Sequence, residues 1–264
     1  MFYTRKCGEI EESDFGSEQT LCGWLQDTRN LGGIAFLQLR DITGVIQLTL
    51  LKKKLGEENF KSWANINRES IILVRGIVKE NKEAPGGVEM LPDNIELMNE
   101  AETPLPLGVI DKIDSEIETR LNARYLDLRK TEIAANFQIR AAISGAVHKH
   151  LRRENFLEVQ TPKIIASATE GGTSLFEMKY FDKTAYLAQS PQLYKQMLMS
   201  GGLERVYEVG PAFRAEEHNT PRHLNEFISI DIEMSFADDD VVMGVMERLV
   251  ATAARAVLKE TEAL

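Results

Sequence analysis

The sequence is poor in the residues that form covalent cross-links or bind metal ions. It has 2 cysteines and 4 histidines in 264 residues. Cys7 and Cys22 form no Cys-x-x-Cys pair, which argues against a disulfide framework or a structural zinc site. His148 and His150 are two positions apart on a predicted helix, so they face different sides, unlike an i, i+4 ligand pair. We therefore expect no metal site among these residues.

Long apolar runs are also missing. No stretch approaches the roughly 20 apolar residues that a membrane span requires, and residues 1–14 lack the apolar core of a signal peptide. Hydrophobic residues make up 43% of the chain and charged residues 27%, which is typical of an ordinary globular protein. The length suffices for two modest domains with separate cores. We expect a cytoplasmic protein.

Positive charge is scarce relative to negative charge. The chain has 31 Lys and Arg residues against 41 Asp and Glu residues, giving a formal net charge of -10. Binding to nucleic-acid phosphates requires Lys and Arg, so this balance argues against an extended nucleic-acid surface. A local basic face can still coexist with an acidic remainder. Composition alone favours a metabolic enzyme, and any role with nucleic acid must be argued from motifs.

The first part of the chain favours β-structure. Five runs of strand-forming residues, several of them alternating, are separated by turns that contain glycine, and they cover residues 21–28, 34–39, 45–51, 71–78 and 88–97. A helical pattern over residues 53–65 lies between the third and fourth runs. Three strands, a helix and two strands is the order of an OB-fold, a barrel whose exposed face often binds single-stranded nucleic acid. We assign residues 1–100 to this barrel.

The character of the sequence changes at residue 101. Pro104 and Pro106 stiffen the chain and remove backbone donors, so residues 101–130 are predicted to be a hinge or linker. A second domain, residues 131–264, opens with a helix over 133–151, where Ile139, Ile143, Val147 and Leu151 form one stripe. Strands then alternate with helices, and a last helix is predicted over 241–259.

The segment after this long helix carries a first motif. Residues 156–162, Phe-Leu-Glu-Val-Gln-Thr-Pro, read as a strand that ends at a proline. An ordinary helix packed on a strand explains this string equally well. Its meaning therefore depends on the segments that follow.

A polar hairpin is the strongest pattern in the chain. Residues 213–219, Phe-Arg-Ala-Glu-Glu-His-Asn, are followed by Arg-His-Leu-Asn-Glu-Phe at 222–227 and by Asp231. We interpret this as a strand, a polar loop and a second strand. Arginine can fork onto a phosphate or a carboxylate, and neighbouring carboxylates can fix its orientation, so the loop suits a polyanionic ligand. Surface ion pairs on a solvated hairpin are the alternative.

Together these segments resemble the class II aspartyl-tRNA synthetases of archaeal type. The first segment is similar to their motif 1, which builds a dimer interface, and the hairpin is similar to their motif 2. The resemblance implies an all-β OB-fold barrel that binds the anticodon, joined to an α+β core of antiparallel sheet and flanking helices. It also implies ATP-dependent activation of L-aspartate, transfer to tRNA(Asp), and a homodimer that uses Mg²⁺.

The resemblance gives the hairpin residues roles in ATP binding. The residues it assigns to ATP are Arg214, Glu216, Arg222, His223, Leu224 and Phe227. Arg214, the catalytic residue, would bridge the α-phosphate and the substrate carboxylate. Glu216 would hold the adenine amino group, and Phe227 would stack under the ring. Arg222 and His223 would meet the outer phosphates. Catalysis then comes from holding the reactants in line and neutralising charge, without a protein nucleophile.

The amino-acid pocket is predicted between the two motifs. Ser190 and Pro191 are typical of a helix start, which places Gln192 and Lys195 on one face near the amino end. A lone lysine is usually a surface residue. The resemblance implies instead that Gln192 contacts the backbone groups of aspartate, that Lys195 binds its side-chain carboxylate and that Asp231 orients this cluster. Lys195 favours aspartate over asparagine.

A glycine-rich loop over residues 168–173 precedes that helix. Paired glycines permit large backbone excursions. In the family the equivalent loop closes over the substrate, and Glu170 would bind the α-ammonium group of aspartate. An exposed turn is the alternative explanation.

The barrel positions implied to contact tRNA come from the same resemblance. Arg29, Phe36 and Gln47 fall where aspartyl enzymes grip the anticodon, with Phe36 stacking on a base and Gln47 reading its edge. In isolation Phe36 would be a core residue. Pro85, in Pro-Gly-Gly, is typical of enzymes that accept tRNA(Asn), and Gln26 replaces the tryptophan of strictly aspartate-specific relatives. We expect a relaxed enzyme that charges tRNA(Asp) and tRNA(Asn).

Motif 3 of the family has no counterpart after Phe236. This Gly-rich segment carries an arginine for adenine, and the acidic residues that hold Mg²⁺ belong to the same region. We therefore interpret the chain as a fragment with an incomplete core. Two alternatives stay open. One is an asparaginyl-tRNA synthetase-like enzyme, against which Lys195 argues, and the other is a non-catalytic tRNA-binding protein derived from a synthetase.

The missing motif predicts that these 264 residues are a weak catalyst. A pyrophosphate-exchange assay with ATP and L-aspartate measures the activation step directly. We expect exchange far below that of a complete enzyme, because one face of the adenine and the Mg²⁺ ligands are not provided. Near-normal turnover would contradict the prediction.

Overall fold

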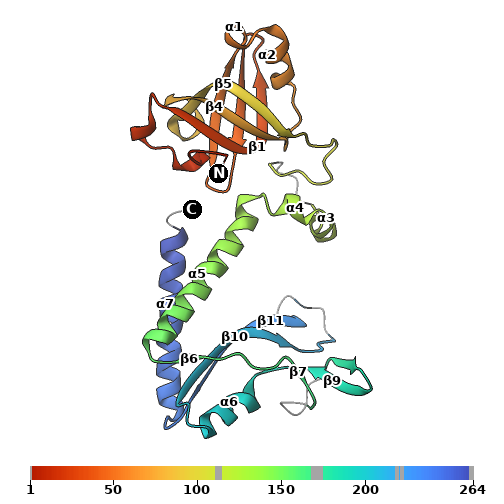
Figure 1. Cartoon of the computed structure of the whole chain (residues 1–264), viewed down its shortest axis with the longest axis vertical. Coiled ribbons are helices and arrows are strands. Elements are labelled where there is room, and N and C mark those ends of the chain that lie inside the picture. Colours follow the sequence, from red (N-terminus) through yellow and green to blue (C-terminus); the bar gives the residue numbers. More distant parts are fainter. Residues whose placement is uncertain (1, 111–114, 168–174, 218–219, 221–222, 262–264) are drawn as a thin grey trace. The chain divides into compact units, whose positions relative to one another are not determined.

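The structure is a computed structural model that describes residues 2–110, 115–167, 175–217, 220 and 223–261. It divides into two compact units, residues 1–130 and 131–264 (Figure 1). Each unit has its own hydrophobic core. Of the predicted site residues, Glu170 and Arg222 lie outside the described residues.

Unit 1 contains a closed five-stranded barrel. Its strands, in the barrel order β1-β2-β3-β5-β4, are β1 (Glu18–Asn30), β2 (Ile34–Arg40), β3 (Val45–Leu51), β5 (Val88–Asn99) and β4 (Ile71–Glu80). Neighbours are antiparallel except β3 and β5, which pair in parallel. This is the topology of an OB-fold, and the sequence-based prediction of that fold is confirmed.

The barrel core follows from alternation along the strands. Ala35, Leu37 and Leu39 on β2 are fully buried, whereas Phe36 and Gln38 between them are half-buried and point to the other side. On β3, Ile46, Leu48 and Leu50 alternate in the same way. The barrel is therefore filled by aliphatic side chains, and its outer wall carries polar and aromatic residues.

The predicted helix of residues 53–65 is divided in two. Helix α1 (Lys52–Leu55) and helix α2 (Glu57–Ala64) meet at Gly56, whose φ of 79° and ψ of 164° are not helical. Glycine takes this left-handed value of φ without a steric penalty, which explains the break. Both helices lie at one end of the barrel (Figure 1), and Phe60 and Ala64 of α2 are buried in the barrel core.

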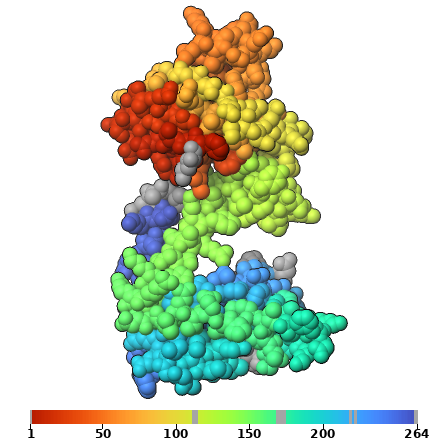
Figure 2. Space-filling model, in the orientation of Figure 1, coloured from red at the N-terminus to blue at the C-terminus, as the bar shows by residue number. Residues whose placement is uncertain are grey.

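The first residues of the chain pack onto the barrel surface (Figure 2). Two short 3₁₀ helices, η1 (Cys7–Glu9) and η2 (Glu12–Asp14), lie in this segment. The backbone N–H of Cys7 donates to Asp41 over 2.7 Å, and Thr4 exchanges hydrogen bonds with Thr20 on β1. Cys7 and Cys22 are both free thiols, and burial raises the pKa of Cys7. A third 3₁₀ helix, η3 (Pro85–Gly87), precedes β5.

Residues 101–130, predicted to be a linker, form a small core of their own. Leu107, Ala123 and Leu126 are buried together, the latter two around helices α3 (Ile117–Asn122) and α4 (Arg124–Asp127). The carboxylate of Asp127 is fully buried and forms ion pairs with Arg120 and Arg124. The described residues of this stretch belong to the same compact unit as the barrel.

Unit 2 is built from two long helices and two small sheets. Helices α5 (Thr131–Arg153) and α7 (Asp239–Thr261) run antiparallel beside each other (Figure 1). The main sheet has the order β11-β10-β6, with β6 (Leu157–Glu158), β10 (Arg205–Phe213) and β11 (Glu226–Met234). The second sheet has the order β7-β9-β8, with β7 (Ile164–Ile165), β8 (Glu177–Tyr180) and β9 (Lys183–Leu187). Helix α6 (Gln192–Ser200) lies between β9 and β10 in the sequence.

One face of the main sheet packs against the long helices. Val147 and Leu151 of α5, Val245 and Leu249 of α7, and Tyr207 of β10 are buried together. Ile143, on the predicted stripe, packs against the same cluster. These contacts leave the opposite face of the sheet free of the two long helices, and that face carries the predicted site residues. Within the described residues, no helix is long and apolar enough to cross a membrane.

The close crossing of β4 and β5 gives a test of the barrel. A Cβ added to Gly76 would lie 2.3 Å from the carbonyl oxygen of Leu91, on the partner strand. We expect Gly76→Ala to destabilise the barrel by about 1–3 kcal/mol, because backbone must move to relieve the overlap. Urea unfolding measures this loss.

The matched control for that test is Gly33→Ala, since a Cβ at Gly33 meets no atom within 4 Å. Its free energy of unfolding should stay close to that of the parent chain. Equal stability of the two variants would show that the strands can separate without cost.

Candidate functional site

The candidate site lies on the face of the main sheet that the long helices do not cover. Along β11, Phe227, Ser229, Asp231 and Glu233 share one side, while the isoleucines between them share the other. Asp231 lies directly opposite Glu208 of β10 in the antiparallel register. Since paired residues point to the same side of a sheet, one face collects several carboxylates.

Lys195 reaches this face from helix α6. Its side chain is only 3% exposed, and its Nζ lies 3.2 Å from Oδ1 of Asp231 and 3.4 Å from Oε2 of Glu233. The ammonium also donates to the carbonyl oxygen of Ile232 over 3.1 Å. A buried charge requires such partners, because desolvation without pairing is very costly. The sequence-based pairing of Lys195 with Asp231 is found, and Glu233 is an additional partner.

The start of helix α6 differs by one residue from the predicted one. The helix begins at Gln192 and Pro191 is its N-cap, whereas Ser190 was expected to cap it with Pro191 in the first turn. Proline has no side-chain acceptor, so the backbone N–H of Gln192 donates instead to Oγ of Ser190 over 3.3 Å. Gln192 is half-buried, one helical turn before Lys195.

Glu208 ties motif 1 to the same face. Its carboxylate is almost fully buried and accepts hydrogen bonds from the backbone N–H and Oγ1 of Thr161, over 3.1 and 2.7 Å. Nζ of Lys163 lies 2.8 Å from the same carboxylate. The segment that follows β6 is therefore anchored to β10 beside Asp231. The sequence motifs did not predict these contacts.

Arg214 and Phe227 face each other at the other end of the strands. The guanidinium carbon of Arg214 lies 5.3 Å from the centroid of the Phe227 ring, in cation–π geometry. The sequence suggested that neighbouring carboxylates hold this arginine. Among the described residues its position is instead set by the aromatic face and by its backbone N–H, which donates to the carbonyl oxygen of Asn225.

The described part of the hairpin loop is held by Asn225. Its Oδ1 accepts a hydrogen bond from the backbone N–H of Glu216 over 3.1 Å. His223 and Leu224 are exposed, and Nδ1 of His223 lies 2.7 Å from Oγ1 of Thr220. Glu216 is half-buried next to Arg214. The loop thus brings the described motif 2 residues to the end of the polar face.

A second candidate site is a hollow of about 410 Å³ on the wall of the barrel. Its lining residues are Asp27, Thr28, Arg29, Phe36, Gln38, Gln47, Asn81, Glu83 and Pro85. The structure therefore brings together all three predicted anticodon residues and Pro85, although they come from different strands and a 3₁₀ helix. Gln26 does not line the hollow, but its amide nitrogen donates to Oε1 of Gln38 over 3.2 Å.

A buried carboxylate supports the floor of this hollow. Glu89 of β5 accepts hydrogen bonds from Oγ1 of Thr49 over 2.5 Å and from Nε2 of Gln47 over 3.2 Å. Nζ of Lys79 lies 2.9 Å from its other oxygen. Burial opposes ionisation of Glu89, but the hydrogen bonds from these groups outweigh it and lower its pKa. The carboxylate is therefore charged and fixes the amide of Gln47.

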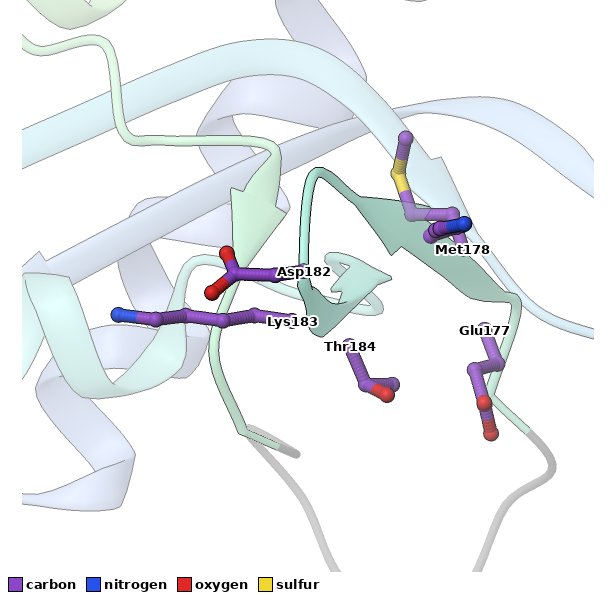
Figure 3. Close-up of a pocket in the computed structure, with 6 residues that line it drawn as sticks. Glu177, Met178, Asp182, Lys183 and Thr184 are labelled. Carbon is purple, nitrogen blue, oxygen red and sulfur yellow. The ribbon is translucent and has the colours of Figure 1, made fainter.

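Another hollow, also of about 410 Å³, follows the β8–β9 hairpin (Figure 3). Glu177, Lys179, Lys183 and Thr184 on its lining are exposed, and the labelled side chains spread in different directions. A hairpin surface of this kind has no converging polar groups. It is therefore weaker as a binding site than the two sites described above.

The described residues do not provide a metal site. No group of three or more His, Cys, Asp or Glu side chains in that part of the chain is arranged to hold a metal ion. His148 and His150 serve other contacts: Nδ1 of His148 lies 3.0 Å from the Tyr207 hydroxyl, and Nδ1 of His150 lies 3.2 Å from Oγ1 of Thr252.

Comparison with known families assigns both units. Residues 116–264 match the family model of class II tRNA synthetases (D, K and N), and residues 19–98 match the OB-fold nucleic acid binding domain. The chain belongs to the class II tRNA synthetases.

Individual relatives of this synthetase chain are aspartate and asparagine enzymes. The chain is 55% identical over 248 residues to the aspartate–tRNA(Asp/Asn) ligase of Methanopyrus kandleri, covering 94% of this chain and 58% of that protein. It is 50% identical over 254 residues to the aspartate–tRNA(Asp) ligase of Thermococcus kodakarensis, covering 96% and 58%. The resemblance to archaeal aspartyl-tRNA synthetases is therefore confirmed, and the chain spans little more than half the length of these relatives.

A solved structure confirms the fold of the synthetase chain. It aligns with asparaginyl-tRNA synthetase from Pyrococcus horikoshii, complexed with asparaginyl-adenylate, at a TM-score of 0.92 and 33% identity. The alignment covers 100% of this chain and 60% of that one. The barrel joined to a class II core was correctly predicted.

Three carboxylates are among the site residues that were not singled out from the sequence: Glu233, Glu208 and Glu89. All three are acidic residues in strands, and the residues directly before and after each of them are apolar or aromatic. A carboxylate at such a position either faces solvent or needs a buried partner. That pattern could have identified them as candidates, but their partners come from distant elements and are visible only in the fold.

Substitution of the buried Lys195 tests how much its ion pairs with Asp231 and Glu233 contribute to stability. Lys195→Met keeps the length of the side chain but leaves Asp231 and Glu233 without their cation. We expect unit 2 to lose about 3 kcal/mol of stability, because unpaired carboxylates remain at a largely desolvated place. Urea unfolding followed by a probe in unit 2 measures it.

Lys179→Met is the matched control, because Lys179 is exposed on β8. It should unfold like the parent chain. If both variants lose the same stability, the effect reflects the loss of any lysine and not the pairing at Lys195.

Proposed function

We propose that this chain is the barrel and the first part of the catalytic core of an aspartate–tRNA(Asp/Asn) ligase. Such an enzyme activates L-aspartate with ATP and transfers it to tRNA(Asp) and tRNA(Asn). The observation that carries the proposal is the buried Lys195 held by Asp231 on the open face of the sheet. The names of the archaeal relatives support the same assignment.

The amino-acid end of the site favours an anionic substrate. Hydrogen bonds to Asp231 and to the carbonyl oxygen of Ile232 hold the Lys195 ammonium, and its third N–H would donate to the substrate carboxylate. Asp231 would be a positioning residue for Lys195. Gln192, on the same helix as Lys195, would contact the backbone groups of aspartate. Glu170 would bind the α-ammonium group. The side-chain carboxylate of aspartate would add a charged partner for this ammonium, whereas the amide of asparagine would not, which favours aspartate.

The nucleotide end of the site suits ATP. Phe227 offers an aromatic face for adenine, and Arg214 beside it can place its fork between the α-phosphate and the aspartate carboxylate. Glu216 would hold the adenine amino group. His223 and Leu224 follow the loop, and with Arg222 they would meet the outer phosphates. These groups neutralise charge as it develops at phosphorus, so no nucleophilic side chain is required.

Mg²⁺ supplies charge neutralisation at the phosphates of this enzyme family. The acidic groups of the described residues do not form a site that fits it. No step of the mechanism is therefore assigned to a metal bound by these residues. A homodimer built through residues 156–162 and a cytoplasmic location complete the proposal.

The barrel hollow is the proposed site for the anticodon. Arg29, exposed at its edge, can pair with phosphate, Phe36 can stack on a base, and Gln47 can read a base edge. Pro85 in the same hollow and Gln26 behind it support acceptance of tRNA(Asn) as well as tRNA(Asp). The acidic net charge of the chain is compatible with this, because the contact is local.

Binding of tRNA to the 264-residue chain tests this assignment. We expect similar affinity for tRNA(Asp) and tRNA(Asn) and weaker binding of a tRNA with an unrelated anticodon. Phe36→Ala should weaken binding about tenfold, since stacking on an aromatic ring contributes about 1–3 kcal/mol per base. Filter binding at fixed salt measures each affinity.

Phe181→Ala is the control, because Phe181 is an exposed phenylalanine that belongs to unit 2 and not to the barrel. Equal affinity for all three tRNAs, or an equal effect of both substitutions, would contradict the assignment of the hollow.

A further inference from the structure

A chain of buried and half-buried polar side chains leads to the barrel hollow. The guanidinium of Arg40 donates to both oxygens of Glu69, over 3.0 and 2.8 Å, and to Oε1 of Gln26, over 3.3 Å. Gln26 then donates through Nε2 to Oε1 of Gln38. Gln38 lines the hollow, whereas Arg40 and Glu69 are buried and do not. Gln26 and Glu69 also line a separate hollow of about 300 Å³, so the contacts lead from that hollow to the barrel hollow.

The backbone is shaped to make this chain of contacts. Gln26 lies at a register shift between Leu25 and Asp27, where β1 carries one residue more than β2. A bulge of this kind re-aims a side chain, here toward Gln38 and Arg40. Glu69 adopts a positive φ of 66°, which is uncommon for a residue with a side chain. Its carboxylate is also bound by Arg129 over 2.7 Å.

The chemistry of the donors fixes the orientation of each amide. A guanidinium has only donors, so the atom of Gln26 that faces Arg40 must be its oxygen. The nitrogen of Gln26 then faces Gln38, whose facing atom must in turn be oxygen. The remaining group of Gln38 is its NH₂ donor. Among the described residues, no side chain accepts from this nitrogen.

Gln47 is oriented in the opposite sense. Its NH₂ group faces the ionised carboxylate of Glu89, which can only accept, so its free group is the oxygen. Gln38 and Gln47 are direct cross-strand partners on β2 and β3. The hollow therefore offers a donor and an acceptor side by side, next to the ring of Phe36.

We propose that Arg40 and Gln26 are positioning residues that set the polarity of the barrel hollow by turning the Gln38 amide nitrogen outward. The inference rests on the proposed function, in that the ligand is a base of single-stranded RNA. The acceptor on a base edge would then face the Gln38 nitrogen and the neighbouring donor would face the Gln47 oxygen, so the base fits in one orientation only. Gln26 contributes to RNA binding in this way without touching the RNA.

Gln26→Glu reverses the polarity at nearly constant shape. The new carboxylate keeps the contact with Arg40 but can only accept, so Gln38 must turn its NH₂ group toward it and present oxygen to the hollow. Binding of the anticodon stem-loop of tRNA(Asp) to the full 264-residue chain should weaken about tenfold. This is the effect expected when one hydrogen bond is lost and the Gln38 oxygen faces an acceptor on the base. Asn94→Asp, which adds the same charge at an exposed position of β5, should stay within about twofold of the parent.

A double substitution separates positioning from simple charge repulsion. Gln38→Met removes the amide through which Gln26 is proposed to act. In this background Gln26→Glu should cause no further loss, because the two changes then act on one contact. A full additional tenfold loss in the Gln38→Met chain would overturn the proposal. Thermal unfolding of each variant shows that the comparison is made between folded chains.

The side-chain amide of Gln38 gives a readout without RNA. In the ¹⁵N-glutamine-labelled free chain, Gln26→Glu should shift the Gln38 amide resonance and slow its proton exchange, whereas Asn94→Asp should do neither. An unmoved resonance overturns the proposal even where RNA binds. If the parent chain fails to bind the stem-loop while the resonance responds as expected, the proposed anticodon role of the barrel fails and the positioning of Gln38 stands.

Discussion

The two-residue period of the β-strand is the constraint on which both sites depend. In β11 it separates a row of polar side chains from a row of isoleucines, and in β2 it separates the wall of the barrel from its core. Each site therefore lies on the face of a sheet opposite to the face that contributes to a hydrophobic core. A shift of register by one residue would move the core residues to the site face and the site residues to the core. The same strand register therefore determines both the fold and the sites.

Burial of charge is handled differently at the two sites. At Lys195 a cation from a helix is surrounded by carboxylates of a neighbouring strand, so the charge is balanced before any ligand arrives. At Glu89 the charge is negative and is compensated largely by donors on adjacent strands. In both cases the pairing holds a side chain that a ligand can use in a fixed orientation. This order exists before binding, which reduces the entropy that binding must overcome.

Local patterns in the sequence were sufficient for the main elements of the fold. The five strands and the two long helices were predictable because their apolar residues recur at two-residue or helical spacing. The division of the predicted helix at Gly56 and the start of α6 at Gln192 depend on single dihedral angles, which periodicity does not report. The packing of residues 101–130 with the barrel depends on contacts such as Arg129 with Glu69, between residues far apart in the chain.

Some site residues could likewise be predicted from the sequence and others could not. Lys195, Asp231 and Arg214 could be identified because they stand in strings that resemble a known family. Their partners could not, since Glu233 and Glu208 are ordinary strand residues until the register of β10 and β11 and the position of α6 bring them near a lysine. Sequence similarity thus points to the residues that meet the substrate, whereas the residues that hold them in place come from the geometry of the fold.

The left-handed backbone at Glu69 also affects which mutations the barrel tolerates. Glycine would relax this position, since it adopts positive φ without a steric penalty, and at most strained sites such a change is harmless or stabilising. Here it would remove the carboxylate that binds both Arg40 and Arg129 and leave two guanidinium groups near the same turn without their anion. The substitution that relaxes the local backbone is therefore one that the surrounding charges oppose.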